Sequence, residues 1–139
     1  MATPKVFLDT NLLIYTDDSS SQTKQAIAIQ CLETHFLQRS AVVSIQVLQE
    51  YFSVTTRKLR VPSEIAREKV ALFGSLEVFQ PSATDILAAI DLHRLHNISF
   101  WDAMIVRAAS QSGCRILLSE DLHPGQRLDG VEVVNPFLR

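Results

Sequence analysis

Short apolar runs alternate with longer stretches of helical spacing along almost the whole chain, and this alternation most constrains its fold. Runs that are apolar on both faces are typical of strands in a parallel sheet that helices cover on both sides. The sequence therefore predicts one α/β domain over residues 1–139, a three-layer α/β/α sandwich with a central parallel sheet. The expected strands are Lys5–Leu8, Ala41–Val43, Val78–Phe79 at an edge, Arg115–Leu118 and Val131–Val134.

The segments between these runs have the spacing of amphipathic helices. Apolar residues recur three and four positions apart, as at Ile27, Cys31 and Phe36. Gly113 stands where a left-handed residue would end the last helix. The expected helices are Leu12–Thr16 after Asn11, Thr23–Gln38, a helix from the cap Ser44 to Arg57, Ser63–Phe73, a helix capped by Thr84 or Asp85 and ending at His96, and one from the cap Ser99 to Gln111.

The composition is that of an ordinary globular protein with nearly balanced charge. The 139 residues carry a net charge of −2 and the pI is about 6.0, which argues against nonspecific binding of nucleic acid over the whole surface but leaves an RNA substrate open. No apolar run is long enough to cross a bilayer, and the N-terminus leads directly into a strand-like run. Cys31 and Cys114 lie among apolar residues and are expected to be free thiols. We therefore expect a cytoplasmic protein without a membrane segment.

Four acidic residues stand where an apolar run gives way to a helix or a turn. Asp9 and Asp121 follow the first and fourth strand-like runs, Asp102 lies in a first helical turn, and Glu50 lies about two turns into a helix. The carboxyl ends of parallel strands share one edge of a sheet, so these acids are expected to converge. Carboxylates pushed together repel unless a cation joins them, and oxygen ligands suit Mg²⁺ or Mn²⁺. The pattern predicts a divalent-metal site that hydrolyses phosphoesters.

Each acid also has a simpler structural interpretation. Asp9 is a preferred helix N-cap, and Asp102 stands three residues after Ser99, as in a capping box. Glu50 shares a helix face with Gln46 and is compatible with a solvated surface position. It is the ordered set, rather than any single residue, that favours the metal site.

The turn after the fourth apolar run contains two acids, Glu120 and Asp121, either of which could belong to the metal site. Strand alternation places Ser119 and Asp121 on one side of the chain and Glu120 on the other. Asp121 is therefore the expected site residue, and Glu120 is its rival.

The motifs that carry these acids resemble those of PIN-domain ribonucleases, and most closely the VapC-type toxins of prokaryotic VapBC toxin–antitoxin pairs. The resemblance runs nearly end to end. It implies an α/β/α sandwich, hydrolysis of RNA phosphodiesters with Mg²⁺ or Mn²⁺, a homodimer and a small cognate antitoxin as partner. The matching segments are Phe7–Asn11, Val47–Glu50, Ser99–Ile105 and Leu118–Leu122.

The resemblance also implies a role for each site residue. Asp9, Asp102 and Asp121 would be metal ligands, and Glu50 would complete the acidic quartet. Thr10, Asn11 and Ser119 would hold the site by hydrogen bonds. Trp101 stands where the family often has Tyr, and Ser119 where Thr is common; neither change removes a ligand.

Basic residues are expected to hold the RNA backbone. Arg57, Lys58 and Arg60 follow the helix of Glu50 and are the best candidates. The alternative is a solvated helix end, where cations are favoured by the helix dipole.

Two other functions compete with a nuclease. One is an RNA-binding or scaffold module that keeps the fold without useful nuclease activity, which the four intact acids disfavour. The other is a phosphotransfer enzyme or receiver domain. The Asp9-Thr10-Asn11 sequence lacks the second aspartate of such a phosphatase signature, and no lysine follows a strand where a receiver would need one.

Overall fold

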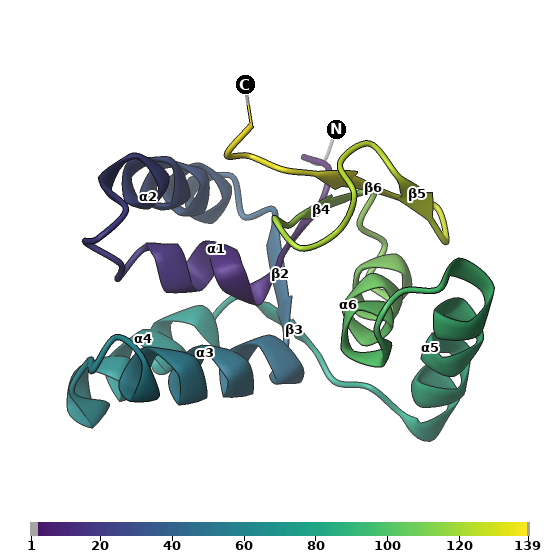
Figure 1. The fold of residues 1–139 in the computed structure, drawn as a ribbon, viewed down its shortest axis with the longest axis horizontal. Helices are drawn as coiled ribbons and strands as arrows, with labels where there is room; N and C mark the ends of the chain where they lie inside the picture. The colour runs from purple at the N-terminus through teal and green to yellow at the C-terminus, as the bar shows by residue number, and fades with distance from the viewer. Residues whose placement is uncertain (1–2, 139) are drawn as a thin grey trace.

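A central sheet runs through the middle of the molecule in the computed structural model, which describes residues 3–138 (Figure 1). In this part of the chain the sheet has six strands in the order β3-β2-β1-β4-β6-β5, and all neighbours are parallel except β5 and β6. Met1, Ala2 and Arg139, which the predicted domain includes, lie outside the described residues. The strands are β1 (Val6–Leu8), β2 (Ala41–Ser44), β3 (Glu77–Phe79), β4 (Ile116–Leu118), β5 (Arg127–Leu128) and β6 (Val131–Val134).

Helices cover both faces of this sheet. Figure 1 shows α1 to α4 on one side of the strands and α5 with α6 on the other. The predicted three-layer α/β/α sandwich with a central, mostly parallel sheet is confirmed. The helices are α1 (Thr10–Tyr15), α2 (Gln22–Leu37), α3 (Ile45–Arg57), α4 (Ser63–Phe73), α5 (Ala83–His96) and α6 (Phe100–Gln111). None of the helices in the described residues is long and apolar enough to cross a membrane.

The two-sided cover explains why the strands are continuous apolar runs. Phe7 and Leu8 point to opposite faces of β1, and both are fully buried. Fully burying a side chain of this size stabilises the fold by roughly 1.5–3 kcal/mol. Cys31 and Cys114 are free thiols, as expected, and burial raises the pKa of Cys114 to about 12.

Strand β5 was not expected from the sequence. It pairs antiparallel with β6 through Arg127 and Leu128, and the two strands are joined by Asp129 and Gly130. Both linking residues have positive φ, 51° and 79°. An Asp-Gly pair with positive φ at both positions is the strongest short-range signal for a two-residue hairpin turn, so the signal was present in the sequence.

The N-cap of α5 corrects one prediction, whereas the other two expected caps are confirmed. Ser82 caps α5, rather than Thr84 or Asp85. The hydroxyl of Ser82 accepts from the Asp85 amide at 3.4 Å, and the Asp85 carboxylate accepts from the Ser82 amide at 2.8 Å. This reciprocal capping box satisfies two amide groups at once, which neither predicted cap would do. Ser44 and Ser99 cap α3 and α6 as predicted.

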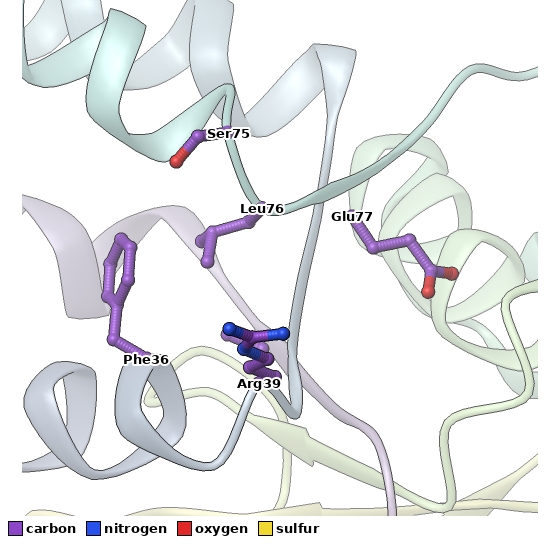
Figure 2. Close-up of a pocket in the computed structure, with 6 residues that line it drawn as sticks. Phe36, Arg39, Ser75, Leu76 and Glu77 are labelled. Atoms are coloured by element: carbon purple, nitrogen blue, oxygen red, sulfur yellow. The ribbon is translucent and has the colours of Figure 1, made fainter.

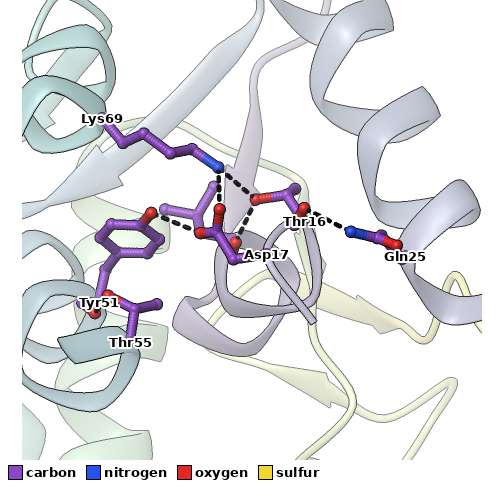
Figure 3. Close-up of polar contacts among 7 residues, drawn as sticks. Thr16, Asp17, Gln25, Tyr51, Thr55 and Lys69 are labelled. Carbon is purple, nitrogen blue, oxygen red and sulfur yellow. Dashed lines mark hydrogen bonds and ion pairs between the residues drawn. The ribbon is translucent and has the colours of Figure 1, made fainter. Parts of the chain in front are cut away.

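A polar cluster joins the end of α1 to the helices around it (Figure 3). The Asp17 carboxylate accepts from the Tyr51 hydroxyl at 2.5 Å and from Lys69 Nζ at 2.9 Å. Lys69 also donates to the Thr16 hydroxyl at 2.9 Å, and Gln25 donates to the Thr16 carbonyl at 3.1 Å. The cluster therefore holds α3 and α4 in a set position against α1.

We predict that Lys69→Met lowers the free energy of unfolding by about 2 kcal/mol, because it leaves a mostly buried carboxylate without its cation. Lys5→Met is the matched control. Lys5 pairs with Glu77 at 2.9 Å, but both side chains are nearly half exposed, so its loss should cost less than about 1 kcal/mol. Urea unfolding of the two variants measures the difference, and equal losses would contradict the role given to the cluster.

Candidate active site

Asp9 lies at the carboxyl end of β1 and is also the N-cap of α1. Only 4% of its surface is exposed. One carboxylate oxygen accepts from the Thr10 amide at 2.7 Å, and the other accepts from the Ser119 hydroxyl at 2.6 Å. The capping interpretation of Asp9 and its place among the other acids are therefore compatible.

The pKa of Asp9 depends on its burial and on the charges of the other acids. Burial raises its pKa to about 7, while the hydrogen bonds from Ser119 and Thr10 act in the opposite direction. The negative charges of Asp121 and Asp102 raise this pKa further. Three of the predicted site residues therefore share one region of negative potential.

Ser119 joins two of the acids, and Glu120 is turned elsewhere. The fully buried Ser119 hydroxyl donates to Asp9 and accepts from the Asp121 amide at 3.1 Å. Glu120 instead accepts from the Tyr15 hydroxyl at 2.7 Å and pairs with Lys24. Burial opposes ionisation of Glu120, but Lys24 and Tyr15 hold its pKa below the usual value. Glu120 is thus engaged by Tyr15 and Lys24, and the choice of Asp121 as the site residue stays a prediction.

Asp102 occupies the first turn of α6, where Ser99 also contributes. The Ser99 hydroxyl accepts from the Asp102 amide at 3.0 Å. Burial raises the pKa of the Asp102 carboxyl, a hydrogen bond with Ser99 lowers it, and the charge of Asp121 raises it. Asp102 is thus half-buried and interacts with a second acid.

Glu50 reaches the site through Thr10. One Glu50 carboxylate oxygen accepts from the Thr10 hydroxyl at 2.9 Å and from Gln46 Nε2 at 3.3 Å. Gln46 Nε2 also lies 3.3 Å from the Trp101 carbonyl, so it links α3 to the start of α6. The spacing of four residues between Gln46 and Glu50 indicates their contact from sequence alone, whereas the contact of Gln46 with Trp101 has no such local signal.

The residue types around Asp9 suit a hard cation. Both polar side-chain atoms of Asn11 are buried without a hydrogen-bond partner, two residues after Asp9. A buried amide in that state costs free energy that a ligand or water would recover. Within residues 3–138, no three His, Cys, Asp or Glu side chains are grouped closely enough to make a ready metal cluster. The ligand set Asp9, Asp102 and Asp121 stays a prediction.

The basic segment does not lie beside the acids. Arg57, Lys58 and Arg60 are exposed at the C-terminal end of α3. A helix rises 1.5 Å per residue, so Arg57 lies about 10 Å further along the axis than Glu50. Figure 1 shows α3 running from the region of β3 toward the side of the molecule opposite α6.

A pocket of about 400 Å³ opens at the other edge of the sheet. Figure 2 shows Phe36, Leu76 and Arg39 around it, and Ala41 and Glu77 belong to its wall. Ala41 and Glu77 are the first residues of β2 and β3, whereas Asp9 and Ser119 follow the ends of β1 and β4. This pocket is therefore separate from the candidate active site.

The fold and the acids at its carboxyl edge agree with one protein family. The model of the PIN domain matches residues 6–127, and the chain belongs to the PIN-domain family. No curated protein matches the sequence.

Solved structures with the same fold include bacterial toxins. The VapC20 toxin of Mycobacterium tuberculosis, described as cleaving the sarcin–ricin loop, has a TM-score of 0.66 at 17% identity and covers 84% of this chain and 92% of its own. A toxin–antitoxin complex from Klebsiella pneumoniae has a TM-score of 0.66 at 19% identity, covering 95% and 98%. VapBC2 from Rickettsia felis, bound to a promoter DNA fragment, has a TM-score of 0.66 at 20% identity, covering 92% and 96%. The likeness confirms the predicted PIN-like fold.

The raised pKa of Asp9 predicts how stability changes with pH in EDTA. The folded protein keeps a proton up to about pH 7 that the unfolded chain releases near pH 3.8, so this group's contribution to stability is lost as pH rises between those values. Asp9→Asn mimics the protonated form and should remove that part of the pH dependence. Urea unfolding across this range should show that the free energy of unfolding of the variant increases relative to that of the wild type as pH rises.

Asp91→Asn is the matched control, since Asp91 is exposed on α5. It should leave the pH dependence unchanged. A wild-type slope that persists in Asp9→Asn would contradict the burial of a protonated Asp9.

Proposed function

We propose that the protein is a metal-dependent endoribonuclease that hydrolyses RNA phosphodiester bonds. The observation that carries the proposal is the buried Asp9 carboxylate, whose pKa is raised by burial and by the charges of Asp121 and Asp102. A cation bound beside a buried acid in this setting would favour its ionised form. Membership of the PIN-domain family supports a nuclease as the class of enzyme.

Three carboxylates would hold the cation. Asp9, Asp102 and Asp121 provide the oxygen ligands that Mg²⁺ or Mn²⁺ prefers, and the partnerless amide of Asn11 lies nearby in the chain. When bound, such a cation offsets charge on the phosphate and makes water a usable nucleophile near neutral pH.

The remaining site residues would position these groups. Ser119 and Thr10 orient the two oxygens of Asp9, and Ser119 also holds the amide of Asp121. Thr10 and Gln46 orient Glu50, whose carboxylate would accept a proton from the attacking water. This arrangement needs neither a cysteine nor a histidine as nucleophile or base.

We further propose that the protein is the toxin of a type II toxin–antitoxin pair, acts as a homodimer and is neutralised by a small antitoxin. The support is its similarity in fold to the toxin–antitoxin complex from Klebsiella pneumoniae and to VapBC structures, including one from Salmonella typhimurium bound to DNA. The three chains compared above are each covered over more than nine tenths of their length, so the likeness extends over the whole toxin fold.

Asp9→Asn should reduce the rate of RNA cleavage with Mg²⁺ or Mn²⁺ by at least about 100-fold, because it removes a charged ligand. Cleavage of a labelled RNA measures the rate, and circular dichroism checks that the variant is folded. Wild-type cleavage by Asp9→Asn would overturn the site.

Two matched pairs of variants sharpen this test. Asp121→Asn should lose activity while Glu120→Gln retains most of it, because Glu120 contacts Lys24 and Tyr15 instead of the site. Calorimetric titration of the wild type with Mn²⁺ should show binding that Asp9→Asn weakens. A wild type that gives no heat and cleaves no RNA would favour the scaffold module.

Expression tests the toxin role. We expect the wild type to arrest growth of a bacterial host and Asp9→Asn to allow normal growth, since the arrest would require RNA cleavage. Colony counts after induction, with equal protein levels checked by immunoblot, measure the effect. An active nuclease that leaves growth unaffected would contradict the toxin role but not the nuclease.

A further inference from the structure

Trp101 is a large aromatic residue that stays 61% exposed beside the acidic residues. A single exposed apolar side chain is common on protein surfaces, so exposure alone carries no conclusion. Its position does. Trp101 directly precedes Asp102, and its carbonyl accepts from Gln46 Nε2, the same nitrogen that donates to Glu50. The residue therefore stands at the rim of the candidate active site.

The indole of Trp101 is held in place by the neighbouring Phe100 ring. The Phe100 ring packs edge-on against it, with ring centres 5.0 Å apart and planes at 70°. Phe100 itself packs against the buried residues Ala89, Ala103 and Met104 between α5 and α6. The platform belongs to a capped helical turn rather than a loose loop, so a ligand would lose little free energy in ordering it.

The side chains that hydrogen-bond to the acids offer no positive charge to a phosphate backbone. The acids hydrogen-bond to the side chains of Ser119, Thr10 and Gln46, none of which is basic. The basic segment Arg57–Arg60 lies at the distant end of α3. A substrate with a negatively charged backbone would therefore gain from a contact made through its bases. Unpaired nucleobases stack on exposed aromatic side chains, and such contacts tolerate different base sequences.

We propose that Trp101 is a stacking platform for an unpaired base of single-stranded RNA next to the phosphodiester that is cleaved. This inference rests on the proposed ribonuclease function and adds to it a residue that binds the substrate. It assigns the affinity for RNA at the site partly to a base, rather than to the phosphate backbone alone.

Fluorescence tests this directly because Trp101 is the single tryptophan of the chain. In EDTA, so that RNA stays intact, an oligouridine should quench the emission of the full-length protein. A matched oligonucleotide with the same phosphate backbone and abasic sugars should not. Equal quenching by both would overturn the proposal, since it would indicate contact with the backbone.

Variants separate stacking from apolar contact. Trp101→Leu should weaken binding of a labelled oligouridine by about tenfold, whereas Trp101→Phe should retain most of the affinity, as measured by fluorescence anisotropy. Ile65→Ala, which removes a half-exposed side chain on α4, is the control and should bind like the wild type. Wild-type affinity in Trp101→Leu would overturn the proposal.

Two outcomes distinguish this inference from the proposed function. RNA that is bound and cleaved without any change in Trp101 emission would refute the stacking platform and leave the ribonuclease intact. Absence of RNA binding and cleavage by the wild type would refute both. A change in emission that depends only on protein concentration would place Trp101 in a protein interface and overturn the proposal.

Discussion

The hydrogen bond from the Ser119 hydroxyl to the Asp9 carboxylate is the contact on which the site depends. It joins residues 110 positions apart in the chain, and it forms because β1 and β4 are parallel neighbours with Leu8 opposite Leu118. The other contacts of the site are connected to this hydrogen bond. Ser119 also holds the Asp121 amide, Asp9 caps α1, and the next residue, Thr10, reaches across to Glu50.

The acids in this region differ in whether a basic side chain neutralises them. Asp17 and Glu120 are paired with Lys69 and Lys24, close to the ends of the same elements that carry the site. Asp9 has only neutral hydrogen-bond partners, and burial raises its pKa to about 7. Ionisation of Asp9 would weaken the fold, because the carboxylate is buried, whereas the proposed metal site requires the ionised form. A bound cation would relieve that conflict.

The sequence predicted most of the sandwich because each strand is buried on both faces, which leaves a continuous apolar run. The helix caps Ser44 and Ser99 were also predictable, since capping depends on residues three positions apart. Two local features were missed. Ser82 was overlooked because Thr84 and Asp85 also favour helix starts, and β5 was overlooked because its two residues are too short to show alternation, although Asp129-Gly130 marks the turn.

The sequence by itself determined the fold class and predicted where the acids would meet, because the order of strands and helices restricts where polar residues can follow a strand. Only the tertiary structure decided which side chains touch. The contact of Thr10 with Glu50, and the link from Gln46 to the Trp101 carbonyl, depend on how α1, α3 and α6 pack together. The same packing places Glu50 of α3 next to Thr10, whereas Arg57 lies at the C-terminal end of that helix. Such contacts join residues distant in the chain, and no local pattern encodes their distances.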